Sequence, residues 1–160
     1  MNEQIKAEEF AEYLSDDELS KLAPLLDRLS LLEDQKTNQD NYLKFVKKIW
    51  PSFIEGKHHK IYADKLQQVA DGKIKRLIVN MPPRHTKSEF ASYLFPAWLM
   101  GRRPDLKIIQ ATHTAELAVG FGRKVKNLID SDDFRDIFPE IKLATDAKAS
   151  GRWSTNGGGE

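Results

Sequence analysis

The segment from Ile74 to Ser88 constrains the fold of this 160-residue chain more than any other part of the sequence. Its first half, Ile74–Met81, is short, rich in β-branched residues and almost continuously apolar from Leu77, which is typical of a strand buried on both faces. A turn with two prolines follows, and the spacing of apolar residues then changes to that of a helix. The sequence therefore predicts a buried strand, a tight turn and a helix in direct succession.

The same order of elements is repeated further along the chain. We expect a helix over Ser88–Met100, which Pro96 should kink or end early, and a second strand over Leu106–Thr112. Thr114 then caps a helix that runs to Ile129. Because strands and helices alternate, the expected fold class is α/β, with a parallel sheet and right-handed crossovers.

Residues 1–50 are expected to form a helical N-terminal arm, and residues 51–160 the core. Apolar residues recur at three- and four-residue spacing through Glu8–Leu32, which predicts two short helices. Ser15 or Asp16 is the predicted cap of the second helix. A third helix is expected to begin at a cap on Thr37 or Asn38 and to end at Trp50-Pro51. A fourth helix should run from His59 to a left-handed C-cap at Gly72.

The composition is that of a soluble globular protein. Hydrophobic residues make up 40% of the chain and charged residues 31%, and the absence of cysteine excludes disulfides and thiolate metal sites. No stretch approaches the roughly 18 apolar residues of a membrane span, and the N-terminus lacks a signal-peptide pattern. We therefore expect a cytosolic protein without a membrane anchor.

The formal net charge of +1 conceals an uneven distribution. Residues 1–34 hold three Lys and Arg against ten Asp and Glu, a net charge of −7, which leaves +8 for the rest. A basic remainder suits the phosphates of DNA or of a nucleotide, but the pI of 7.9 lies below the value above about 9 that dedicated nucleic-acid binders show. A solvated basic surface explains the charge equally well.

The turn carries residues that suit phosphate binding. A P-loop places Gly-x-x-x-x-Gly-Lys-Ser/Thr between strand and helix, because backbone N–H groups and the helix N-terminus hold the phosphates while the hydroxyl binds Mg²⁺. Lys87 and Ser88 fill the last two positions, whereas Met81 and Thr86 replace the glycines. Thr86 is β-branched and resists the positive φ that glycine allows, at a cost of about 1–3 kcal/mol. The guanidinium of Arg84 compensates by offering a fork of N–H donors to a phosphate. The alternative is a structural turn that happens to contain Lys-Ser.

The stretch Leu77–Glu89 resembles the Walker A region of the large terminase subunits of tailed bacteriophages, the ATP-driven motors that package viral DNA. The family's common form is Pro-Pro-Arg-His-Gly-Lys-Ser, and Thr86 stands in place of its glycine. The resemblance extends over about residues 50 to 160, through Trp98, Arg102-Arg103-Pro104, the stretch 111–123 and the segment Trp153–Gly159.

The resemblance implies the parallel sheet of a P-loop NTPase, incomplete in this chain, that binds ATP and Mg²⁺. Lys87 would contact the β- and γ-phosphates, Ser88 would ligate Mg²⁺, and Arg84 would act as an arginine in cis. Arg84 and Lys87 are therefore the expected catalytic residues. The expected ATP-binding residues are Pro82, Pro83, Arg84, His85, Thr86, Lys87 and Ser88.

By the same resemblance, we expect ATP-driven translocation of double-stranded DNA into a procapsid in the host cytoplasm. The implied partners are the portal protein and the small terminase subunit, and the full-length protein would form a homo-oligomeric ring on the portal. The family's Walker B acids and nuclease domain would follow Glu160, so we expect an N-terminal fragment that is inactive alone. A helicase-type, nucleic-acid-stimulated ATPase fragment and a nucleotide-free interaction module are the alternatives.

The four histidines do not form a metal-binding pattern, because none has a partner at the spacing of a metal site. We expect His58 and His59 on the surface at the start of a helix, in the region where the terminase family places an adenine-contacting segment. His85 is expected to act in the loop through its backbone.

Overall fold

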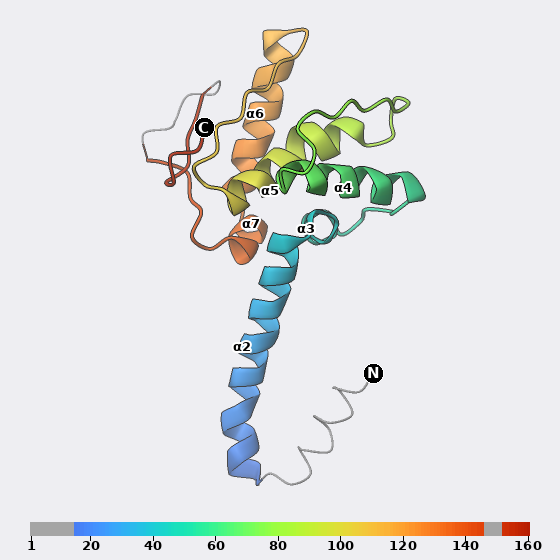
Figure 1. Ribbon diagram of the computed structural model, residues 1–160. Coiled ribbons are helices and arrows are strands. Elements are labelled where there is room, and N and C mark those ends of the chain that lie inside the picture. Colours follow the sequence, from blue (N-terminus) through green and yellow to red (C-terminus); the bar gives the residue numbers. More distant parts are fainter. Residues whose placement is uncertain (1–14, 146–151) are drawn as a thin grey trace. The chain divides into compact units, whose positions relative to one another are not determined.

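The computed structural model describes residues 15–145 and 152–160, and the regular structure in these ranges is helical (Figure 1). The chain divides into two compact units, residues 1–34 and residues 35–160. The elements in chain order are α2 (Asp16–Asp40), α3 (Tyr42–Ile49), α4 (Lys57–Ala70), the π-helix η1 (Glu89–Leu94), α5 (Phe95–Arg102), α6 (Ala115–Ile129) and α7 (Asp132–Ile137). None of the described helices is long and apolar enough to cross a membrane.

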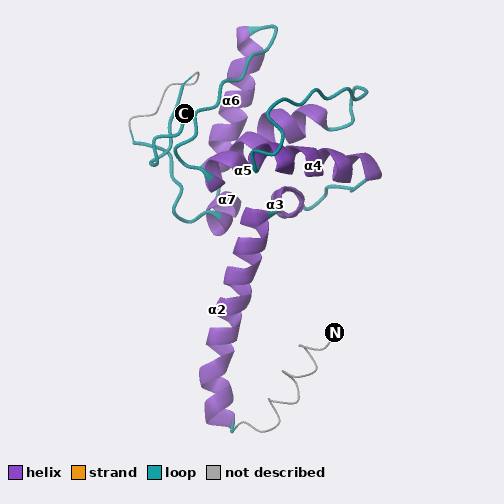
Figure 2. Ribbon diagram, in the orientation of Figure 1, coloured by secondary structure: helices purple, strands orange, loops and turns teal. Residues whose placement is uncertain are grey.

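The predicted α/β fold with a parallel sheet is wrong for the part of the chain that the structure describes. Residues 15–145 and 152–160 contain no strand, and both predicted strands, Ile74–Met81 and Leu106–Thr112, lie in loops (Figure 2). No backbone hydrogen bond joins the two segments within these ranges. Extended backbone becomes a strand only when its N–H and C=O groups pair with a neighbour, so local β propensity alone does not produce a sheet.

The exposure pattern of these segments shows why the prediction failed. Leu77, Val79 and Met81 pack against the helical core, whereas Ile78 between them is 87% exposed. In the second segment, Ile108 packs on the core and Ile109 is 94% exposed. A continuous apolar run predicts burial on both faces, but only alternate side chains are covered here.

Helix α2 begins with a reciprocal cap at Ser15, one of the two cap residues that the sequence predicted. The Glu18 carboxylate accepts hydrogen bonds from the Ser15 backbone N–H (2.9 Å) and hydroxyl (2.7 Å), while the Glu18 N–H faces the Ser15 oxygen at 3.4 Å. The first predicted helix lies mostly before residue 15, outside the described residues. Leucines at positions 22, 25, 26, 29, 31 and 32 of α2 are exposed.

The predicted start of the third helix at Thr37 or Asn38 is wrong, because α2 continues to Asp40. Asn41 is the cap of α3 instead, and its side chain accepts the Lys44 N–H at 3.0 Å. Asn38 is buried, and its carbonyl accepts the Trp98 indole N–H at 3.1 Å. A polar residue that looked like a cap therefore lies in a helix interior.

The other helix boundaries largely agree with the sequence. Helix α3 ends before Trp50, and the Thr114 hydroxyl caps α6. Helix α4 ends at Ala70 and is followed by its C-cap Asp71 and by Gly72 at φ 74°. Helix α4 starts at Lys57, two residues earlier than predicted. The short helix α7, capped by Ser131, was not predicted.

Phe90 is the centre of an aromatic cluster that joins the helices of residues 35–160. It is fully buried, and its ring centroid lies 5.8 Å from Tyr42 of α3, 5.5 Å from Phe53, and 5.4 and 5.7 Å from His59 and Tyr62 of α4. The Tyr42 hydroxyl donates to the Phe90 carbonyl at 2.7 Å, and burial raises the pKa of this hydroxyl well above its usual value. Three separate stretches of chain are thus fixed to η1 by one side chain.

Pro96 does not end the helix that follows the loop, which was one of the two outcomes that the sequence predicted. The chain is helical from Lys87 to Arg102, with the π-helix η1 immediately before the proline. Proline has no N–H for the carbonyl four residues earlier, which is that of Ser92. The Gln110 side-chain amide donates to this carbonyl at 2.7 Å, so the second predicted strand segment supplies the hydrogen bond that Pro96 cannot.

The last residues pack closely on Pro104. The Pro104 carbonyl accepts the Thr155 hydroxyl at 2.8 Å and the Gly159 N–H at 2.7 Å. A Cβ at Gly157 would lie 2.5 Å from the Pro104 Cβ, and one at Gly159 would collide with the Pro104 carbonyl oxygen. Nearby, Leu143 and Thr155 form one antiparallel bridge.

Replacement of Gln110 by Met should lower the free energy of unfolding by about 1 kcal/mol, because the Ser92 carbonyl loses its donor while side-chain volume is retained. Urea denaturation followed by circular dichroism measures the change. Ile109→Met is the matched control, since Ile109 is 94% exposed and should change stability by less than about 0.5 kcal/mol. Equal effects of the two substitutions would contradict the assignment.

Candidate functional site

The residues singled out by the sequence surround one cavity at the start of a helix. The loop lies between the irregular segment that ends at Met81 and the helical stretch that begins at Lys87. The cavity has a volume of about 520 Å³. It is lined by Met81, Pro82, Pro83, Arg84, Thr86, Lys87, Ser88 and Glu89, which include every predicted site residue except His85.

Two loop residues have left-handed backbone conformations. Arg84 has φ 62° and Thr86 has φ 59°, and they are the only described residues other than glycine with positive φ. The conformation at Thr86 is the one that glycine adopts without cost and that a β-branched residue resists. The position that departs from the P-loop pattern is therefore strained, by about 1–3 kcal/mol.

The loop presents hydrogen-bond donors that no other described residue uses. The backbone N–H groups of Arg84, His85 and Thr86 donate to no acceptor in residues 15–145 or 152–160. Lys87 and Ser88 follow as the first helical residues, whose N–H groups have no intrahelical acceptor. Consecutive free N–H groups at a helix N-terminus form a site for an anion.

The charge around the cavity is positive and uncompensated. The side chains of Arg84 and Lys87 are exposed, and neither forms an ion pair with a residue in the described ranges. The one carboxylate that lines the cavity, Glu89, forms an ion pair with Lys124 of α6 at 3.3 Å. The field at the loop therefore favours a negatively charged ligand.

The buried His59 contacts the loop directly. Its Nδ1 accepts the Gly56 N–H at 2.9 Å, and its Nε2 lies 2.8 Å from the Thr86 hydroxyl oxygen. The Thr86 hydroxyl in turn donates to the His85 carbonyl at 2.6 Å. Since Gly56 can only donate and the hydroxyl proton is used, one neutral tautomer, with the proton on Nε2, satisfies all these contacts.

The imidazole of His59 is held firmly and kept neutral. Only 6% of the residue is exposed, and its ring lies 4.7 Å from Phe53 and 5.4 Å from Phe90. Burial lowers its pKa, and the positive field of His58 adds to this effect, while Glu55 opposes it. The expectation that His59 is a surface residue was wrong, because Phe53 from the preceding loop and Phe90 from a distant part of the sequence pack against it.

The other predicted residues lie at the loop as well. Pro83 accepts a hydrogen bond from the His85 ring at 2.9 Å through its carbonyl, and the Lys87 carbonyl accepts the Tyr62 hydroxyl at 3.3 Å. Ser88 is exposed at the start of the helix. Among the described residues, no three or more His, Asp and Glu side chains are grouped so that they could hold a metal ion.

Sequence reasoning missed the contribution of α4 to this site. His59 and Tyr62 reach the loop from 27 and 25 residues away along the chain. The available signal was that both positions share the apolar face of the predicted helix; it could have suggested burial of His59, which was instead expected on the surface, but it named no partner.

No protein-family model matches the chain, and neither does any curated protein or solved structure.

The thermal stability of the protein should fall as the pH decreases below 6.5, the ordinary pKa of histidine. The folded-state pKa of His59 is lowered, so the unfolded chain takes up a proton that the folded chain resists. The stabilisation is complete above pH 6.5 and is lost as the pH falls towards the lowered pKa.

Melting curves between about pH 7.5 and about pH 5.5 measure this loss. His59→Gln should show a smaller decrease in melting temperature over that range than the wild-type protein. His113→Gln, a change at an exposed histidine before α6, should retain the wild-type decrease. An unchanged decrease in His59→Gln would assign the pH dependence to other groups.

Proposed function

We propose that the loop Pro82–Ser88 binds ATP together with Mg²⁺, and that the chain is the ATP-binding part of a viral DNA-packaging motor of the large-terminase type. The observation that carries this proposal is that Arg84, Thr86 and Lys87 line one cavity at a helix N-terminus, where unused backbone N–H groups lie beside two cations that have no ion-pair partner among the described residues. The proposal depends on this loop and does not require the parallel sheet that was predicted.

The loop suits a polyphosphate better than a structural role. Three backbone N–H groups at residues 84–86 and the N-terminus of a 16-residue helical stretch can all donate to phosphate oxygens. A turn with only a structural role commonly pairs its N–H groups within the protein, whereas the N–H groups at residues 84–86 are left for water or for a ligand.

Each side chain has a role that follows from its chemistry. Lys87, at the first helical position, neutralises phosphate charge, and the planar guanidinium of Arg84 offers two parallel donors for the terminal phosphate. The exposed Ser88 hydroxyl is a hard oxygen ligand suited to Mg²⁺, which, when bound, bridges phosphate oxygens and offsets their charge. The Glu89 carboxylate is held by Lys124, which limits its repulsion of the phosphates.

The resemblance to large terminase subunits supports the assignment to a packaging motor. The residues that carry it, Pro82-Pro83-Arg84-His85 and Lys87-Ser88, form the proposed site itself. In that setting the partners are double-stranded DNA, the portal protein and the small terminase subunit, and the full-length protein acts in a homo-oligomeric ring as an ATP hydrolase. A helicase-type ATPase is the second candidate for the same loop.

Isothermal titration with ATP and Mg²⁺ should give a binding signal that Lys87→Ala weakens about tenfold or more, because a charge-assisted contact to phosphate is lost. Lys75→Ala, at an exposed lysine before the loop, is the matched control and should bind as the wild-type protein does. Absence of binding by the wild-type protein would favour the nucleotide-free interaction module. Stimulation of hydrolysis by single-stranded DNA alone would favour the helicase-type candidate.

Removal of the Ser88 hydroxyl should affect only the part of the affinity that depends on Mg²⁺. Ser88→Ala is expected to bind ATP about fivefold to tenfold more weakly than the wild-type protein when Mg²⁺ is present, and equally well in EDTA. Ser88→Thr retains a hydroxyl and should preserve the Mg²⁺ dependence. An equal loss by Ser88→Ala under both conditions would show that Ser88 acts through the loop backbone instead.

A further inference from the structure

We infer that His59 is a positioning residue that holds Thr86 in the left-handed conformation, and that it thereby replaces the glycine of the usual P-loop pattern. The inference rests on the proposed function for the ligand of the loop. The contact between His59 and Thr86 is a property of the protein without ligand and can be tested separately.

The need for such a residue follows from the backbone. Thr86 has φ 59°, a conformation in which a β-branched side chain is strained and which an unsupported loop would leave. The Thr86 carbonyl starts the helix, because it accepts the Phe90 N–H at 2.9 Å. If φ at Thr86 became negative, the direction of the loop relative to the helix N-terminus would change, and with it the directions of the N–H groups at residues 84–86.

The contacts of the Thr86 side chain oppose that change. Its hydroxyl oxygen lies 2.8 Å from His59 Nε2 and its hydroxyl proton is donated to the His85 carbonyl, so the side chain is held from α4 and from the loop. Glycine could not make either contact. Thr86, which replaces the glycine of the usual pattern, therefore has the hydroxyl group whose contacts stabilise its own strained conformation.

The imidazole can act in this way because it is itself fixed. The Gly56 N–H donates a hydrogen bond to Nδ1. The ring centroids of Phe53 and Phe90 lie 4.7 and 5.4 Å from that of the imidazole. Phe90 also belongs to the first turns of the helix that follows the loop. The distance between His59 and the loop is thus set by the same buried ring that fixes the helix.

This arrangement predicts how substitutions at His59 and Thr86 combine. If His59 serves to stabilise positive φ at Thr86, a glycine at position 86 removes the need for it. A residue that only supports the fold, or that contacts the nucleotide, would be needed equally with threonine or with glycine. The double-mutant cycle of His59 and Thr86 separates these cases.

The experiment is titration of MgATP into the wild-type protein, His59→Ala, Thr86→Gly and the double variant. His59→Ala should bind about tenfold more weakly than the wild-type protein, and Thr86→Gly at least as tightly. The double variant should bind within about twofold of Thr86→Gly. His59→Gln, which retains an N–H donor, should recover part of the loss with threonine present, and circular dichroism checks that every variant is folded.

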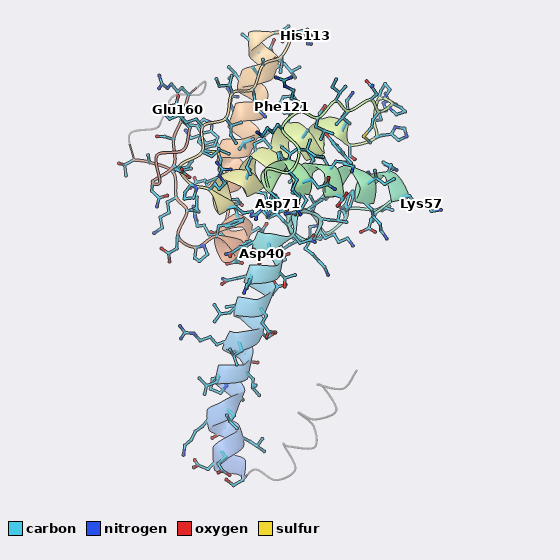
Figure 3. The ribbon with its side chains drawn as sticks, in the orientation of Figure 1. Asp40, Lys57, Asp71, His113, Phe121 and Glu160 are labelled. Carbon is cyan, nitrogen blue, oxygen red and sulfur yellow. The ribbon has the colours of Figure 1, made fainter. Side chains whose placement is uncertain are left out.

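The matched control is His113→Ala, which removes a histidine just before the first turn of α6. Figure 3 labels His113 there and Lys57 in the first turn of α4, the helix that carries His59. The control variant should bind MgATP as the wild-type protein does. An equal loss of affinity from His59→Ala in the threonine and glycine backgrounds would overturn the inference.

A second measurement does not depend on nucleotide. The coupling between the amide and α protons of Thr86, with its Cα and Cβ chemical shifts, reports the sign of φ by NMR. His59→Ala should shift Thr86 towards negative φ, and the imidazole of the wild-type protein should carry its proton on Nε2. If the wild-type protein binds no MgATP but these signals change as expected, the proposed function fails and the inference stands. Unchanged Thr86 signals in His59→Ala would overturn the inference whatever the protein binds.

Discussion

The buried ring of Phe90 is the contact on which the rest of residues 35–160 depends. It lies one turn into the helix that follows the loop, and four aromatic rings surround it from α3, from the segment before α4 and from α4 itself. Aromatic pairs at such distances stabilise a fold beyond the area they bury. Because His59 is one of these rings, the packing that stabilises the helices also fixes the side chain that reaches the loop. Core and candidate site are therefore one assembly.

The loop combines an unfavourable backbone with an unsatisfied set of donors. Thr86 and Arg84 hold positive φ without being glycine, and the N–H groups around them have no acceptor among the described residues. The positive φ of Thr86 raises the free energy of the loop, and the N–H groups remain available to a ligand. Strain and unused polar groups at one place are typical of binding sites, where the fold maintains a conformation that the local sequence would not choose.

Sequence reasoning located the loop and most helix boundaries but not the architecture around them. Ser15, Thr114 and Gly72 act as caps for reasons that are local, so short-range patterns were sufficient to predict them. The two apolar segments also have the alternating exposure of extended chain, yet whether such a segment pairs with another depends on residues far away in sequence. The hydrogen bond from the Gln110 side chain to the Ser92 carbonyl, to which Pro96 cannot donate, likewise depends on residues far apart in sequence. No spacing rule connects positions 92 and 110.

The C-terminal glycines illustrate how composition can mislead about tolerance to change. Asn156-Gly157-Gly158-Gly159 has the composition of a flexible linker, and such segments usually accept substitution, insertion or fusion of a tag without harm. Here two of the three glycines are required because Pro104 leaves no space for a methyl group, and Gly158 between them has φ 84°. In a library of random variants, these positions should be depleted of substitutions as strongly as the aromatic interior, and a designer seeking a permissive attachment point should look elsewhere.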